Sequence, residues 1–210
     1  MVYDPDVGVD RYGNAFTAWK QHSPTYIYPD PVVGFNRFAT GIGWGTTNVL
    51  YPFPTGIAAF LSSPRIAVDD NGNVVMVFVA YGYLTDSLGN HNNEHVKIYA
   101  GRYIPGMGWE TFTRIGTDLT TTKQDLYTPS IAMDRNGNAA VVWNSSGAPP
   151  QVWANLYVAG SGWMTATQMG NTTSDDFITY SSPPRIAIGG NGKVIIVWTN
   201  SQKLYCKMKY

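Results

Sequence analysis

Acidic side chains gather in the stretches of this sequence that lack strand character. They are Asp86, Glu94, Asp125, Asp175 and Asp176. A glycosidase needs two carboxyl groups about 5–10 Å apart, one of them with a raised pKa. Nothing in the spacing pairs any two of these carboxylates. No Ser-His-Asp spacing, phosphate loop or Cys/His cluster stands out either, so the sequence predicts no catalytic residue.

A second candidate for chemistry is the segment His91-Asn-Asn-Glu94-His95, which matches the His-x-x-Glu-His string of some zinc proteases. That chemistry requires both histidines on one face of a helix. Gly89-Asn90 precedes the segment and a predicted strand follows it, so a helix is disfavoured. We interpret the segment as a polar loop and expect no metal site and no cofactor.

These residues are positioned by a pattern that the chain repeats four times, beginning at Pro5, Pro64, Pro129 and Pro184. In each copy a turn residue (Asp10, Asp69, Asp134 or Gly189) is followed nine residues later by Trp19, Phe78, Trp143 or Trp198. Self-similarity at a period of about 50–60 residues is typical of repeat architectures. The pattern predicts one domain over residues 1–210, with repeats 5–63, 64–128, 129–183 and 184–210.

Each turn reads Asp-x-x-Gly-Asn or close to it, which predicts a tight hairpin. Glycine supplies the positive φ, and the Asp carboxylate accepts hydrogen bonds from nearby backbone N–H groups. Calcium binding by Asp10, Asp69 and Asp134 is the alternative, but calcium takes six to eight oxygens. Repeat four also has Gly189 in place of Asp, which favours the hairpin interpretation.

The rest of each repeat reads as strands. The apolar runs Val74–Phe78 and Val194–Trp198 follow the turns and predict strands buried on both faces. A third strand comes next, and then Gly43-Trp44, Gly108-Trp109 or Gly162-Trp163 opens a fourth strand. Repeat four ends at Tyr210 without such a pair. The pattern therefore predicts four-stranded antiparallel units, the last of them incomplete.

The Asp-x-x-Gly-Asn hairpin and the Gly-x-Gly-Trp pair resemble the repeats of secreted bacterial propellers that are loosely related to sialidase-type blades. This resemblance implies an all-β propeller of about four blades. It departs from the sialidase Asp-box, whose aromatic residue lies much closer to its turn, so it implies the fold and not sialidase chemistry. The pattern alone also allows a β-solenoid or a sandwich. Small residues in strand one (Gly8, Ala67, Ala132, Ala187) suit a narrow ring of four blades.

Length varies mainly between strands two and three of each repeat, which predicts variable loops on one face, often the binding face. Aromatic residues beside amides and carboxylates there are suited to stacking on sugars and bonding their hydroxyls. The predicted ligand site comprises Tyr26, Tyr28, Tyr83, Asp86, His91, Glu94, His95, Tyr127, Asp175, Asp176 and Tyr180. Arg65 and Arg185 would oppose each other across a four-blade ring and could clasp a carboxylate or phosphate.

The composition of the chain limits the kinds of binding partner that we expect. Fourteen basic and fourteen acidic residues cancel, so no field attracts nucleic acid. No apolar run reaches the roughly 18–20 residues of a membrane span. The start of this numbering has no signal peptide. The neutral surface, rich in Tyr, Asn and Thr, is common in extracellular and virion-surface β-proteins, and Asn144-Ser-Ser and Asn171-Thr-Thr are glycosylation sequons.

The leading hypothesis is a non-catalytic extracellular or surface module with two ways to act. It binds a glycan or protein through the loop face, or it self-assembles through an open terminal strand at residues 203–210. The alternative is a glycoside hydrolase that uses the loop carboxylates.

Overall fold

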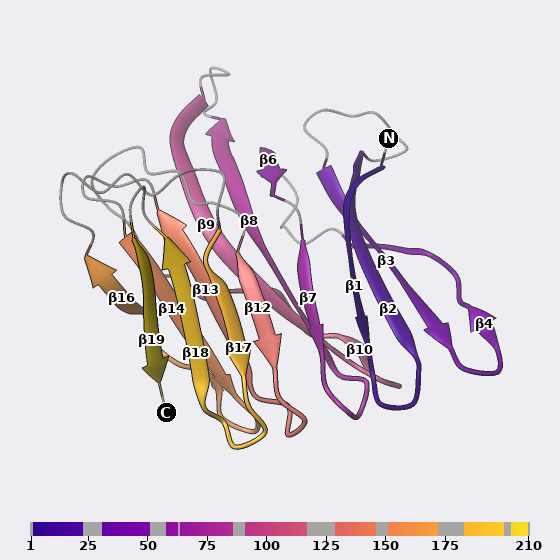
Figure 1. Cartoon of the computed structure of the whole chain (residues 1–210). Coiled ribbons are helices and arrows are strands. Elements are labelled where there is room, and N and C mark those ends of the chain that lie inside the picture. Colours follow the sequence, from indigo (N-terminus) through magenta and orange to yellow (C-terminus); the bar gives the residue numbers. More distant parts are fainter. Residues whose placement is uncertain are drawn as a thin grey trace.

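The computed structural model describes residues 2–22, 31–50, 58–62, 64–85, 91–116, 129–145, 151–171, 183–199 and 203–209. In these ranges the regular structure is β-strand, arranged as four antiparallel sheets in chain order (Figure 1). The sheets follow the predicted repeats except at Ala58–Leu61, which lies within predicted repeat 5–63 but pairs into the second sheet. No helix long and apolar enough to cross a membrane occurs in these ranges. The sheets stand side by side as blades 1 to 4. The predicted all-β propeller fold is confirmed.

Blades 1 and 2 are the larger pair. Blade 1 contains β1 (Val2–Val9), β2 (Ala15–His22), β3 (Pro31–Ala39), β4 (Gly43–Trp44) and β5 (Asn48–Leu50). Blade 2 contains β6 (Ala58–Leu61), β7 (Arg65–Val68), β8 (Val74–Thr85), β9 (His91–Ile104), β10 (Gly108–Trp109) and β11 (Thr113–Arg114). β6 pairs with the far end of β8.

Blades 3 and 4 follow the same order. Blade 3 contains β12 (Ser130–Met133), β13 (Ala139–Ser145), β14 (Gln151–Val158), β15 (Gly162–Trp163) and β16 (Thr167–Asn171). Blade 4 contains β17 (Arg185–Ile188), β18 (Val194–Thr199) and β19 (Leu204–Lys209). The described part of blade 4 has three strands, which agrees with the predicted incomplete last blade.

The predicted fourth strand forms in two pieces. In blade 1, β4 and β5 both pair with β3, and two corresponding pieces are present in blades 2 and 3. The glycine of each Gly-Trp pair has a positive φ: 106° at Gly43, 91° at Gly108 and 92° at Gly162. Because other residues rarely adopt that conformation, glycine is required where the chain turns into this strand.

Apolar side chains fill the spaces between neighbouring blades. Phe16 and Phe35 of blade 1 pack with Met76 and Phe78 of blade 2. The next two interfaces are built in the same way, from blades 2 and 3 and from blades 3 and 4. All five residues from Val74 to Phe78 are at most 1% exposed, as the sequence predicted. Each inner blade is therefore held on both faces.

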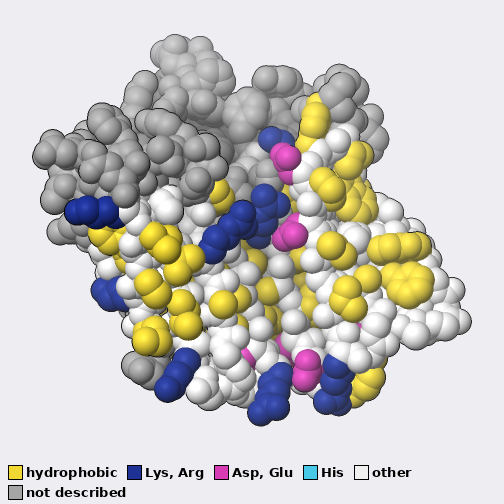
Figure 2. All heavy atoms as spheres, in the orientation of Figure 1, with side chains coloured by type: hydrophobic (Ala, Val, Ile, Leu, Met, Phe, Trp, Pro, Cys, Tyr) yellow, Lys and Arg dark blue, Asp and Glu magenta, His cyan; other side chains and the backbone are white. Residues whose placement is uncertain are grey.

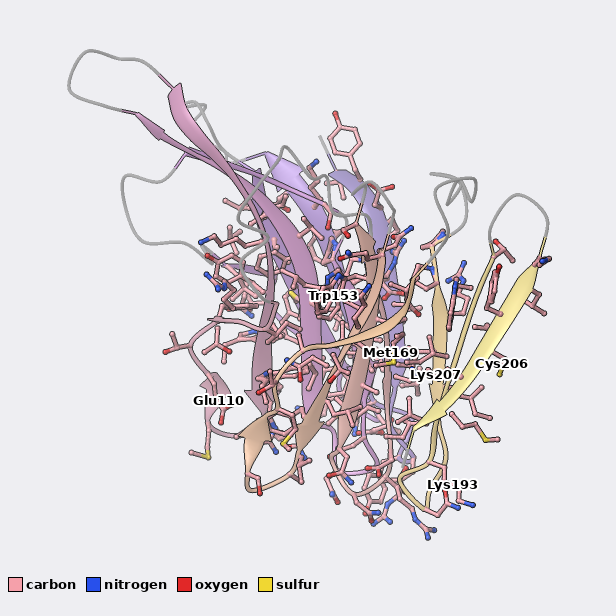
Figure 3. The ribbon with its side chains drawn as sticks, turned by 90° about the vertical axis from the view of Figure 1, so that its left-hand side faces the viewer. Glu110, Trp153, Met169, Lys193, Cys206 and Lys207 are labelled. Atoms are coloured by element: carbon pink, nitrogen blue, oxygen red, sulfur yellow. The ribbon has the colours of Figure 1, made fainter. Side chains whose placement is uncertain are left out.

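Burial on both faces was wrong for Val194–Trp198. Val194, Ile196 and Trp198 are buried against blade 3, but Ile195 between them is 43% exposed. In the described part of the chain no sheet packs on the other side of blade 4. Figure 3 shows the result on β19: Lys207 points toward Met169 of blade 3, whereas Cys206 lies on the side away from the other blades.

The four blades form an open arc. The first strands contact one another in series, β1 with β7, β7 with β12 and β12 with β17, and no comparable contact joins the described strands of blades 1 and 4. Figure 2 shows apolar side chains gathered at both ends of the arc, over blade 4 and over blade 1. Gly8 is small because of a local contact and not because of ring closure: a Cβ at this position would lie 2.5 Å from Val68 Cγ2.

The long insertion in repeat two is used as strand. β8 has 12 residues against 8 in β2, its counterpart in blade 1, and β9 has 14 against 8 in β14, its counterpart in blade 3. His91–His95, expected to be a polar loop, is the first part of β9 and pairs with the end of β8. The expected absence of a helix there is confirmed, and the expected loop is corrected to strand. The extended β8–β9 hairpin rises above the other blades in Figure 1.

Candidate functional site

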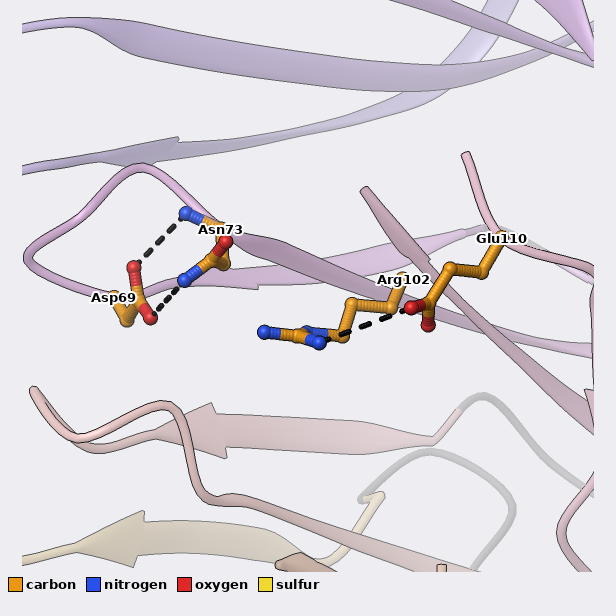
Figure 4. A network of polar contacts seen from close by, with 4 residues as sticks. All are labelled: Asp69, Asn73, Arg102 and Glu110. Atoms are coloured by element: carbon orange, nitrogen blue, oxygen red, sulfur yellow. Dashed lines mark hydrogen bonds and ion pairs between the residues drawn. The ribbon is translucent and has the colours of Figure 1, made fainter. Parts of the chain in front are cut away.

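The Asp turns lie at one end of the blades, which we call the hairpin face. Asp69 Oδ1 accepts hydrogen bonds from the backbone N–H groups of Asn71 (2.8 Å) and Asn73 (2.9 Å). Its Oδ2 accepts one from Asn73 Nδ2 at 2.6 Å (Figure 4). Asp10 and Asp134 make the same three bonds. The carboxylate oxygens thus serve the hairpin, as predicted.

The asparagine of each turn continues the network outward. Asn14 Oδ1 accepts a hydrogen bond from the backbone N–H of Thr40, and Asn138 Oδ1 accepts one from Ala159, both at 3.0 Å. Each bond joins the inner hairpin of a blade to its outer hairpin. The next blade also presses on this network, because a Cβ on Gly72 would lie 3.2 Å from Asp10 Oδ2. These hydrogen bonds and close contacts hold the turns of the hairpin face in place.

The pKa of Asp10 reflects this environment. Burial raises the pKa of the carboxyl group, but hydrogen bonds from the Asn14 side chain and from the backbone N–H groups of Asn14 and Tyr12 outweigh it. The pKa is therefore lowered below its usual value of 3.8. Asp10 is held in the charged form that accepts these bonds.

A second polar link joins blades 2 and 3. The Arg102 guanidinium lies 3.8 Å from a Glu110 carboxylate oxygen (Figure 4) and 5.6 Å from the centre of the Tyr157 ring. Glu110 is half exposed, and an ion pair in that position contributes little stability. The ion pair lies within blade 2, and the contact of Arg102 with the Tyr157 ring is the one that packs blade 2 against blade 3. Among the described residues, no group of three or more His, Cys, Asp or Glu side chains could hold a metal ion.

The opposite end of the blades, which we call the loop face, is where the sequence predicts the ligand residues to lie. Tyr83, His91, Glu94 and His95 lie on the β8–β9 hairpin, where Tyr83 pairs with Glu94 in the backbone register. The remaining residues of the predicted set lie outside the described residues: Tyr26, Tyr28, Asp86, Tyr127, Asp175, Asp176 and Tyr180. The structure thus places four of the predicted residues on one hairpin.

The two arginines are not brought together. Arg65 pairs in register with Val77, so it lies on the side of β7 that faces blade 3. Arg185 pairs with Val197 and lies on the uncovered side of blade 4. β12 stands between β7 and β17. The expected opposition of the two guanidiniums required a closed ring of four, which these strands do not form.

Two polar groups at the loop end of blade 3 were not anticipated as site residues. Asn144 and Ser145 end β13, and each is 1% exposed. Asn144 Oδ1 and Ser145 Oγ have no hydrogen-bond partner among the described residues. Buried polar atoms are usually satisfied by protein or ordered water, so an unmet pair marks a position of interest. The burial also removes Asn144 as a glycan acceptor in the folded chain.

Comparisons with known proteins come from structure. The sequence matches no protein-family model, and a comparison with curated proteins finds no match. Among solved structures, the Hadza microbial sialidase Hz136 superposes with a TM-score of 0.62 and 11% identity, covering 99% of this chain and 44% of that one. The intramolecular trans-sialidase of Ruminococcus gnavus gives 0.61 and 10%, covering 100% and 68%. The α-L-arabinanase of Penicillium chrysogenum gives 0.59 and 13%, covering 99% and 62%.

These likenesses define a class. The chain has the fold of the β-propellers, and its structure is similar to those of sialidase and arabinanase propellers. It spans less than two thirds of the sialidase and of the arabinanase. At identities of 10–13% the likeness shows the fold alone.

Proposed function

We propose that the chain is a single carbohydrate-binding propeller domain that acts outside the cell or at a surface, with the loop face as its binding site. The observation that carries the proposal is the shared fold. The similar structures include two sialidase-type proteins and an arabinanase complexed with arabinobiose, and all three names refer to carbohydrate chemistry. Propellers recur with many functions, so the binding residues have to be tested in this chain itself.

The loop face supplies suitable groups. The proposed site is the predicted set of tyrosines, histidines and carboxylates, with Tyr83, His91, Glu94 and His95 presented on the long β8–β9 hairpin. Aromatic rings stack on the apolar faces of sugars, and carboxylates and amides accept bonds from sugar hydroxyls. The unmet Asn144 Oδ1 and Ser145 Oγ lie at the same end of blade 3 and are the polar groups beneath this face.

The test is a binding screen against sialylated and arabinose-containing oligosaccharides, followed by calorimetry on any that bind. We expect Tyr83→Ala and Tyr180→Ala to weaken binding roughly ten-fold each, the effect of losing one stacking contact. The matched control is Tyr12→Ala, because Tyr12 is exposed on the hairpin face. Equal loss in the control, or no binding to any glycan, would contradict the proposal.

The same screen separates the binding module from a glycoside hydrolase. If Asp86, Glu94, Asp175 or Asp176 is catalytic, the chain will release reducing sugar and the Asn or Gln variants will lose that turnover. We expect no turnover in the unsubstituted chain. Turnover that one of these substitutions abolishes would establish the enzyme instead.

A further inference from the structure

At each end of the arc, one sheet face is not covered by another sheet of the described chain. The tail face is the outer side of blade 4, formed by Ala187, Ile195, Val197, Leu204, Cys206 and Met208, with Arg185 beside Val197 on the same side. The head face is the outer side of blade 1, formed by Val7, Val9, Thr17, Trp19, Phe38 and Trp44. Apart from Arg185 and Thr17 the named residues are apolar, and Figure 2 shows apolar side chains at both ends of the arc. Large exposed apolar patches commonly mark interaction sites.

Equivalent residues of the other blades indicate what kind of surface would pack on the tail face. Six and eight residues after the turn residue lie Phe16 and Ala18 in blade 1, and Ile195 and Val197 in blade 4. In blade 1 both positions are fully buried against blade 2, whereas Ile195 is 43% exposed. Ala18 pairs with Phe35 in blade 1, and Val197 pairs with Cys206 in blade 4. Phe35 is buried, whereas Cys206 is exposed. The tail face thus has the residues of a blade-receiving surface, and no sheet of the described chain covers it.

The head face is the complementary half of the same interface. Trp19 occupies the position of Phe78, Trp143 and Trp198, each of which is buried against the preceding blade. Trp44 occupies the position of Trp109, whose ring lies 5.0 Å from Phe35 of the preceding blade. Within the described chain no sheet packs against Trp44 from that side, and Trp44 is 57% exposed. Val7 and Val9 are similarly exposed, at 61% and 59%.

We infer that the tail face of one copy of this chain binds the head face of a second copy. The contact repeats the interface that already joins blades 1 to 2, 2 to 3 and 3 to 4, so it needs no new kind of surface. It is heterologous, and copies joined this way form a closed ring or a growing filament depending on the angle of the arc. It uses the faces of the terminal blades rather than the free edge of β19.

The experiment is light scattering on the whole chain over a concentration series, with one charge placed on each face. We expect the mass to rise above one chain with concentration, and Ile195→Asp and Val7→Asp each to hold it at one chain. The matched control is Met107→Asp, because Met107 is 81% exposed in the turn between β9 and β10 and lies on neither face. This control should assemble like the unsubstituted chain.

Mixing the two charged variants gives the decisive result. The Ile195→Asp chain keeps its head face and the Val7→Asp chain keeps its tail face, so the mixture should form a two-chain complex with one junction and stop there. If each variant stays a single chain in the mixture, the head-to-tail contact is refuted. A single-chain mass for the unsubstituted protein at every concentration refutes it as well.

A readout without substitution protects the test from misfolded variants. Cys206 is the one cysteine of the sequence and lies exposed on the tail face. Assembly should cover it, so the alkylation rate of its thiol should fall at least about five-fold as the concentration rises, since thiol reactivity depends on access. An alkylation rate independent of concentration would contradict burial of the tail face.

Discussion

At the scale of single residues, the hairpin face depends on carboxylates that accept three hydrogen bonds each. The lowered pKa of Asp10 ties this network to pH. A group whose pKa is lower in the folded than in the unfolded chain contributes stability above its unfolded pKa. That contribution is lost as the pH falls through the lower, folded value. For Asp10 the loss therefore lies in the acid range, below the usual 3.8.

We predict that Asp10→Ala lowers the free energy of unfolding by roughly 1–3 kcal/mol at pH 7, because the N–H groups of Tyr12 and Asn14 lose their acceptor. The difference between variant and unsubstituted chain should shrink below pH 4, where the carboxylate takes up its proton. Urea unfolding at pH 7 and at acid pH measures this. The control is Asp70→Ala, next to the equivalent Asp69 network and outside its bonds. A difference that stays constant with pH would contradict the assignment.

Local sequence was enough to predict this network. The Asp acceptor and the positive φ of the turn glycine concern residues within five positions of one another, and Gly13, Gly72, Gly137 and Gly192 all have φ between 76° and 84°. The unmet polar atoms of Asn144 and Ser145 could not be predicted in this way. Their burial depends on neighbouring blades, and Asn144-Ser-Ser reads in sequence as an exposed sequon.

At the scale of strands, the contacts between neighbouring first strands limit side-chain size. A Cβ on Gly8 would meet Val68 Cγ2 at 2.5 Å, so β1 and β7 approach closely only because Gly8 has no side chain. Ala187 holds the equivalent position in β17, where no following strand covers it in the described chain. The two positions thus share sequence context and differ in their surroundings.

We predict that Gly8→Val lowers the free energy of unfolding by about 1–3 kcal/mol, the usual cost of overpacking. Ala187→Val is the matched control and should change it by less than about 0.5 kcal/mol, as exposed substitutions do. Thermal unfolding at low protein concentration, where single chains prevail, compares the two. Equal losses would mean that β1 and β7 do not approach as closely as described.

The strand pattern of the sequence predicted the type and order of the elements. It did not predict how long each strand is or which strand faces are covered by a neighbouring sheet. The run Val74–Phe78 is followed by further residues that continue β8 to Thr85, and only pairing with β9 and β6 fixes that extension. Ile195 reads as a core residue because its neighbours in sequence are apolar. Its exposure follows from the absence of a covering sheet, which is a property of the arc and not of the strand.

At the scale of the whole molecule, stability should fall from the middle of the arc toward its ends. Among the described residues, blades 2 and 3 are packed on both faces by neighbouring blades, whereas blades 1 and 4 are each packed by a neighbouring blade on one. In repeat structures of this kind, stability is the sum of each unit and its contacts with its neighbours. Closure of a ring would remove this gradient, and the repeat pattern alone does not predict the angle between blades that decides closure.

We predict that amide hydrogen exchange in dilute protein is slowest in β8 and β13 and fastest in β19, by at least about 100-fold. The reason is that β19 can open with the loss of a single blade interface. Exchange measured residue by residue tests this, with β14, which holds the position of β19 in blade 3, as the internal comparison. Uniform protection across the four blades would indicate a ring closed within one chain.

Because the blade faces are equivalent, a chain of this kind can gain or lose whole repeats during evolution. Every junction joins the same two kinds of surface, so an added copy of residues 64–128 would meet a receiving face before it and present one after it. Duplication or loss of a repeat therefore preserves every remaining junction. The number of blades is then a quantity that recombination can change in whole steps, while substitutions inside a blade adjust only how tightly two neighbours fit.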